Sequence, residues 1–317
     1  MYHYFDRRPL EEGVYDMNDA TKDVTRMLGD RERHDEKLPL FVFAAAGSTT
    51  ASMDGLELLD VYGAPRVVLD GRPADESVAG EIDSLVTAEE RTAATVAATV
   101  AAAVNDDVRD ELVHLPAVSY WDEVPEPYAD LAAEADIDAD AARDLREAIA
   151  LEAFYQSYED KRELITDLLF EHEKRDLAEH VAEQFREKLE TEIDTVEPNL
   201  SVRGTTDVSF TVLDAEAFTH RFDFPPTGLL LDEIHRRELG AEGAPGDHHV
   251  TLGVDEDEIH VRSGGRVNAR EIAEAARENA PNAGISAKGT RDGTVEFLVD
   301  EKDAALDAVV EAITEQL

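Results

Sequence analysis

The sequence predicts an α/β protein with a parallel-sheet domain, a helical insert and a smaller C-terminal α/β domain. Three observations predict this class. Short apolar runs at residues 38–43 and 66–69 are separated by a helical pattern, which is typical of buried parallel strands. From about 127 to 197, apolar residues recur at helical spacing among charges. After Pro198, alternating strand patterns return. We therefore expect domains at 1–126, 127–197 and 198–317.

In the first domain, each apolar run is followed by a turn and then by a helical pattern. The elements expected here are helix 16–28, strand 38–43, helix 52–62, strand 66–69 and an alanine-rich helix within 88–104. The first strand ends in the small residues 44–48, and the second ends in Asp70-Gly71-Arg72-Pro73.

The last domain mixes strands and helices over about 115 residues. We expect a strand at 208–212, a helix that ends near 238, a hairpin of 250–254 with 258–262, a helix at 268–278, a strand pair within 285–299 and a final helix at 303–316.

The charge balance is strongly acidic, with 73 Asp and Glu against 30 Lys and Arg and a formal net charge of −43. The acids are spread along the whole chain, and 43% hydrophobic content argues against disorder. This pattern predicts adaptation to a salt-rich cytosol, where the Debye length shrinks to roughly 3 Å. Under that interpretation, net charge does not exclude nucleic-acid binding.

Cysteine is absent, which excludes disulfides, zinc ribbons and thiol catalysis. The first residues contain no apolar signal region, and no stretch approaches 18 apolar residues. We therefore expect a cytoplasmic protein without membrane contact.

One stretch of the last domain resembles a known domain. Residues 258–273 read EIHVRSGGRVNAREIA and are similar to the DHH-associated C-terminal domain, in which a strand ends in Arg-Ser, a turn follows and Val-Asn opens a helix. That domain then carries a Gly-Gly-His-x-x-Ala-Ala-Gly loop, whereas residues 283–289 read AGISAKG here. Residues 222–231 also resemble a segment of archaeal RecJ-like proteins.

The first domain resembles two motifs of the DHH/RecJ-like phosphoesterases, in order and in place. Their second motif is a strand that ends in a metal-binding aspartate before Gly-Ser. Here strand 41–43 runs into Gly47-Ser48, and Ala45 stands at the aspartate position.

The third motif of that family is a strand followed by Asp-His-His. Here residues 67–69 are followed by Asp70, Gly71 and Arg72, so only the aspartate persists. The first motif has no counterpart, and we expect the first βα unit to be missing. The fourth would fall near Asp122.

The resemblance implies a two-metal site with its ligands replaced. Such a site needs several carboxylates and imidazoles to hold two ions about 3.5–4 Å apart. Ala45 and Gly71 offer no ligand, and Arg72 would repel a divalent ion. We therefore expect a fold without its metals, cofactors or nuclease chemistry, in which Asp70 caps a turn. The alternative is a remodelled Mn or Mg site that uses Asp54, Asp70, Asp75 and Asp122.

The glycine-rich loop after the Arg-Ser strand is a candidate phosphate or nucleic-acid site. Its glycines let backbone N–H groups approach an anion, and the following helix adds its positive N-terminus. The residues expected to contribute are Arg262, Ser263, Gly264, Gly265, Arg266, Lys288 and Gly289. A plain strand-to-helix turn would require the same glycines, and the sequence leaves both interpretations open.

A literal Asp247-His248-His249 lies between a loop and a strand, away from the position that the family motif occupies. We expect it, and the dispersed remaining histidines, to be surface or core residues.

Three functions compete. The first is a non-catalytic RecJ-like protein that binds single-stranded nucleic acid or joins a replication complex, since archaeal members of this family partner the GINS complex. The second is an active metal-dependent single-strand exonuclease or phosphoesterase. The third is a regulatory binder of a small nucleotide.

Overall fold

The structure is a computed structural model that describes residues 28–29, 37–71, 74–88, 91–156, 162–204, 208–220, 223–240, 248–263, 267–288 and 293–317. The helix expected at 16–28 lies outside these residues except for its last position. The chain divides into two compact units, 1–185 and 186–317. The three-part division with bounds at 126 and 197 stays a prediction.

A three-stranded parallel sheet forms the start of the first unit. Its order is β1 (Phe41–Ala44), β2 (Arg66–Asp70) and β3 (Ser84–Thr87). The first two strands follow the expected apolar runs. β3 was not expected, because Ser84 and Thr87 interrupt its apolar residues. Since all three strands are parallel, their carboxyl ends meet at one edge of the sheet.

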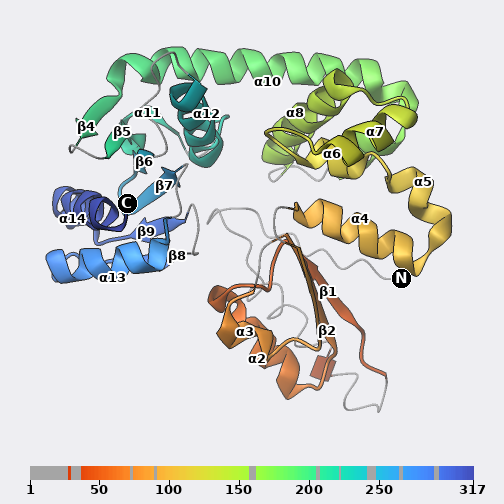
Figure 1. Cartoon of the computed structure of the whole chain (residues 1–317), viewed down its shortest axis with the longest axis horizontal. Coiled ribbons are helices and arrows are strands. Elements are labelled where there is room, and N and C mark those ends of the chain that lie inside the picture. Colours follow the sequence, from red (N-terminus) through yellow and green to blue (C-terminus); the bar gives the residue numbers. More distant parts are fainter. Residues whose placement is uncertain are drawn as a thin grey trace. The chain divides into compact units, whose positions relative to one another are not determined.

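Two helices cover one face of this sheet (Figure 1). They are α2 (Met53–Val61), which follows the short turn η1 (Thr50–Ser52), and α3 (Glu76–Ala79). Buried Leu56, Leu59 and Val78 pack with the partly buried rings of Phe41 and Phe43.

The start of β2 is fixed by a buried cation. Arg66 donates hydrogen bonds to Asp60, to Asp83 and to the carbonyl oxygen of Leu56. Hydrogen bonds from Arg66 lower the pKa of the Asp83 carboxyl. Because a buried charge requires partners, these contacts join α2 and the segment before β3 to β2.

Helices make up the rest of the first unit, and the last of them continues into the second. After the alanine-rich α4 (Ala93–Val104), which packs on β2, the elements are η2 (Asp106–Val108), α5 (Arg109–Leu112), α6 (Leu115–Ser119), α7 (Glu126–Glu134), α8 (Ala139–Gln156), α9 (Arg162–Phe170), η3 (His172–Lys174) and α10 (Arg175–Val196).

The second unit is built on a mixed six-stranded sheet with the order β4-β5-β6-β7-β9-β8. Only β5 and β6 pair in parallel. Its elements are η4 (Glu197–Asn199), β4 (Ser201–Gly204), β5 (Ser209–Asp214), α11 (Ala215–Phe218), α12 (Thr227–Gly240), β6 (His249–Val254), β7 (Glu258–Ser263), α13 (Ala269–Asn279), β8 (Ser286–Lys288), β9 (Thr294–Glu296), η5 (Val299–Glu301) and α14 (Lys302–Gln316).

Helices cover both faces of this second sheet. Figure 1 shows α13 and α14 side by side on one side of it, with α12 on the other. On β6, Val250 and Leu252 belong to the core with α13 and α14, while Thr251 contacts His235 of α12. This two-sided burial explains why β6 is buried at every position.

A pair of histidines is packed between α12 and β6. The rings of His235 and His249 stack with their centroids 5.5 Å apart, and His235 Nδ1 lies 2.9 Å from Thr251 Oγ1. Burial, together with the neighbouring His249, lowers the pKa of His235 to about 4, and burial lowers the pKa of His249 as well. Both rings are therefore neutral in the folded protein at neutral pH.

This pair predicts a loss of stability in acid. The unfolded chain binds protons at these histidines from about pH 6.5 downwards, whereas folded His235 resists protonation until about pH 4. The free energy of unfolding should therefore fall as the pH drops through this window. Chemical denaturation at constant salt should give a shallower fall for His235→Gln than for the exposed control His172→Gln. Equal slopes would contradict the account.

Candidate functional site

The carboxyl ends of the parallel strands bring Ala45 and Asp70 to the same edge of the first sheet. Ala45 follows β1, and its backbone N–H donates to the carbonyl oxygen of Leu69 at 3.0 Å. Its backbone has a φ of 60°, a conformation that a non-glycine residue rarely adopts. The exposed side chain at this position is a methyl group, which cannot coordinate a metal ion.

Asp70 ends β2, and its side chain is engaged inside the protein. The residue is only 3% exposed, and its Oδ2 accepts a hydrogen bond from the Ser48 hydroxyl at 2.5 Å. Ser48 is buried as well. The carboxylate thus connects the end of β2 to the loop that follows β1.

Gly71 lies where the backbone of another segment comes very close. A Cβ atom at this position would lie 1.8 Å from the carbonyl oxygen of Arg91 and 3.0 Å from the carbonyl carbon of Thr92. There is therefore no space for a side chain at the position where the related motif has its first histidine. Arg72 lies outside the described residues.

The segment that crowds Gly71 is itself held in place. Thr92 caps α4 by accepting a hydrogen bond from the backbone N–H of Thr95 at 3.1 Å. Its hydroxyl also lies 2.5 Å from the hydroxyl of Ser119 at the end of α6. Capping satisfies a helix N–H group that would otherwise lack a partner, so the start of α4 has little freedom to withdraw from Gly71.

The other carboxylates of the alternative metal site are Asp54, Asp75 and Asp122, and the structure gives them separate positions. Asp75 directly precedes α3, and its side chain accepts hydrogen bonds from the backbone N–H and the hydroxyl of Thr50, both at 2.8 Å. Asp54 lies in the first turn of α2, and Asp122 is exposed beyond α6. In the described part of the chain, no group of three or more histidine or acidic side chains could hold a metal ion.

The proposed anion-binding loop is only partly described. Gly264, Gly265, Arg266 and Gly289 lie outside the described residues, as does the side chain of Lys288. Lys288 ends β8, which is separated from β7 by β9. The N-terminus of α13 is capped by Asn268, whose Oδ1 accepts from the N–H of Arg270 at 3.0 Å.

Arg262, from the same proposed loop, makes contacts within the protein. Its Nε donates to Asp232, and another guanidinium nitrogen lies 3.4 Å from the carbonyl oxygen of Gly228. Ser263 ends β7 opposite Val250. A phosphate that approached Arg262 would compete with the Asp232 carboxylate. Whether this loop binds phosphate stays a prediction.

Of the literal Asp-His-His, His249 begins β6 and is buried against His235, as described above.

The sequence did not predict the roles of three hydroxyl groups near the strand ends. They belong to Ser48, Thr92 and Ser119 and make polar contacts within the protein. The available signal was weak: Ser48 follows Gly47 in the motif, and Thr92 precedes an alanine-rich run.

Comparison with known proteins identifies the fold of the chain. No protein-family model matches the chain. A solved DHH domain, from a protein described as a member of a family of ribosomal proteins, has a TM-score of 0.82 and 26% identity, covering 97% of this chain and 76% of that one. The chain has a DHH/RecJ-like fold.

One further solved structure and one curated sequence are also similar to this chain. RecJ from Thermus thermophilus, in complex with Mn²⁺, has a TM-score of 0.54 and 16% identity, over 95% of this chain and 51% of RecJ. An uncharacterized protein of Methanocaldococcus jannaschii is 26% identical over 99% of this chain. The chain spans 46% of that curated relative and about half of RecJ.

The DHH/RecJ-like fold confirms the resemblance that the motifs predicted and the α/β class. The archaeal and halophilic assignments stay predictions. Among the helices that the structure describes, none is long and apolar enough to cross a membrane.

The close approach at Gly71 predicts a large effect of a single methyl group. Gly71→Ala should lower the free energy of unfolding by about 1–3 kcal/mol, because the backbone of Arg91 must move. Gly80→Ala is the matched control, since its φ of −75° suits alanine and nothing lies within 4 Å of the added carbon. Urea denaturation of the full chain measures both. Equal stabilities would show that the strand ends are not crowded.

Proposed function

We propose that this chain is a DHH/RecJ-like protein without metal-dependent phosphoesterase activity, which acts as a nucleic-acid-associated subunit or as a subunit of a GINS-type replication complex. The observation that carries the proposal is the arrangement at the strand ends. There Asp70 accepts a hydrogen bond from buried Ser48, and the backbone carbonyl group of Arg91 occupies the space that a side chain at position 71 would need.

The chemistry of a two-metal site explains why this arrangement matters. Two divalent ions about 3.5–4 Å apart need several shared oxygen and nitrogen ligands on neighbouring strand ends. Ala45 offers a methyl group and Gly71 offers no side chain, so these two positions supply none. A buried carboxylate such as Asp70 is stabilised by hydrogen-bond donors, and Ser48 is one such donor. These features favour a structural role for Asp70.

The alternative is an active exonuclease or phosphoesterase with Mn or Mg in a remodelled site. It would require Asp54, Asp75 and Asp122 to join Asp70 at one position. The Asp75 carboxylate instead accepts two hydrogen bonds from Thr50, so recruiting it would break both contacts. This cost is the reason that we favour the non-catalytic proposal.

The binding role is the part of the proposal that needs no metal chemistry. Loss of the metal ions would remove the selection for hydrolysis and leave surfaces that contact nucleic acid or partner subunits. Single-stranded nucleic acid and a GINS-type complex are the two partners proposed from the family resemblance. Binding should be measured at low and at molar salt, because contacts to phosphate weaken steeply with salt.

A nuclease assay tests the catalytic part of the proposal. With labelled single-stranded DNA and Mn²⁺, the wild-type chain and Asp70→Asn should show the same background release of nucleotides. Asp130→Asn is the control, because it removes an exposed carboxylate of α7 that belongs to no candidate metal site. Retention of a GINS-type complex by the tagged chain, without turnover, supports the proposal. Manganese-dependent turnover that Asp70→Asn abolishes would reject it.

A further inference from the structure

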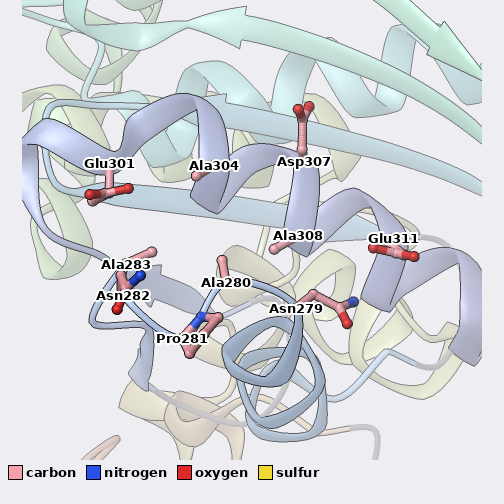
Figure 2. A pocket seen from close by; sticks show the side chains of 10 residues that line it. All are labelled: Asn279, Ala280, Pro281, Asn282, Ala283, Glu301, Ala304, Asp307, Ala308 and Glu311. Carbon is pink, nitrogen blue, oxygen red and sulfur yellow. The ribbon is translucent and has the colours of Figure 1, made fainter.

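A groove in the second unit lies between the C-terminal end of α13 and the side of α14 (Figure 2). Its volume is about 360 Å³, enough for one or two side chains. Ala280, Ala304 and Ala308 give it small apolar walls. This groove is remote in sequence from Ala45 and Asp70 and has no part in the strand-end site.

Carboxylates line the groove along α14. Figure 2 shows Asp307 and Glu311 on this helix and Glu301 at the end of η5, directly before it, above the turn that ends α13. The C-terminal end of α13 carries the negative end of its helix dipole, which also favours a cation. The groove therefore combines an apolar interior with a negative rim.

One contact already demonstrates that this rim accepts a guanidinium group. Arg203 of β4 donates to Asp307 Oδ1 at 2.9 Å, in an exposed ion pair. Within the described residues, the carboxylates of Glu301 and Glu311 have no ion-pair partner. They would be available to basic side chains of an incoming segment.

An exposed apolar surface continues from the groove. Leu298 is 56% exposed and Val299 is 52% exposed, just before Glu301 in the chain. The N–H of Leu298 donates to the carbonyl oxygen of Ala283 at 2.9 Å, which attaches this segment to the groove wall. Exposed apolar side chains beside a concave site are typical of interaction surfaces.

We propose that this surface docks a basic, amphipathic segment of a partner protein. Apolar side chains of the segment would cover Leu298 and Val299 and enter the alanine-lined groove. Its Lys or Arg side chains would lay their aliphatic stems on the apolar walls and place their charges at Glu301 and Glu311. The inference rests on the proposed binding role and names the class of partner.

Charge complementarity favours this occupant over nucleic acid. Phosphates would approach the carboxylates of Glu301 and Glu311 and the negative end of a helix, which repel them at short range. A basic protein segment gains attraction from the same groups. The apolar part of the contact strengthens when structure-making salts are added, while the ion pairs weaken.

The test is fluorescence anisotropy of a labelled peptide, about 15 residues long, with Leu and Ala on one helical face and Lys and Arg on the other. The full chain should bind it. The double variant Glu301→Lys/Glu311→Lys should weaken binding by about tenfold or more. Ala304→Trp, which fills the groove without a change of charge, should weaken it as well.

The matched control is Glu274→Lys/Glu315→Lys, which makes the same change of net charge at two exposed positions outside the groove. It should change the affinity by no more than about twofold. Equal weakening by the two double variants would overturn the inference, as would equal binding of a peptide with Glu in place of Lys and Arg.

The two proposals fail separately. Asp70-dependent turnover together with groove-dependent peptide binding would reject the non-catalytic proposal and support the docking surface. Absence of turnover together with peptide binding that ignores the groove variants would reject the docking surface alone.

Discussion

The backbone of Arg91 and Thr92 lies directly against Gly71, and this contact sets what the ends of the parallel strands can do. It depends on the capped start of α4 and on the hydroxyl pair of Thr92 and Ser119. Beside it, Ser48 donates to the buried carboxylate of Asp70 and holds the loop after β1. Polar contacts within the protein therefore occupy the edge at which the strands β1 and β2 end.

Under the proposed non-catalytic role, this arrangement gives a physical reason for keeping Asp70 and Gly71. A buried carboxylate is costly without a partner, so Asp70 would be retained for stability once Ser48 donates to it. Likewise, a glycine at position 71 is required by the close backbone approach and does not depend on any substrate. The presence of Asp70 and Gly71 at these positions is then explained by their contacts within the protein.

Much of the architecture could be predicted from the sequence because its signals are local. The apolar runs of β1 and β2, the β6–β7 hairpin and the C-terminal helix all appear close to their expected positions. β3 and β4 were missed, since β3 has polar ends and every residue of β4 is exposed. The Ser48–Asp70 bond and the crowding of Gly71 join residues that are about 20 positions apart, and no pattern of spacing or composition reveals such contacts.

Anomalous diffraction from crystals of the chain grown with Mn²⁺ is the most direct measurement of the central claim. We expect no anomalous peak within coordinating distance of the Asp70 carboxylate, with the hydroxyl of Ser48 still donating to it. Two peaks about 3.5–4 Å apart at this edge, the spacing of a two-metal centre, would contradict the account.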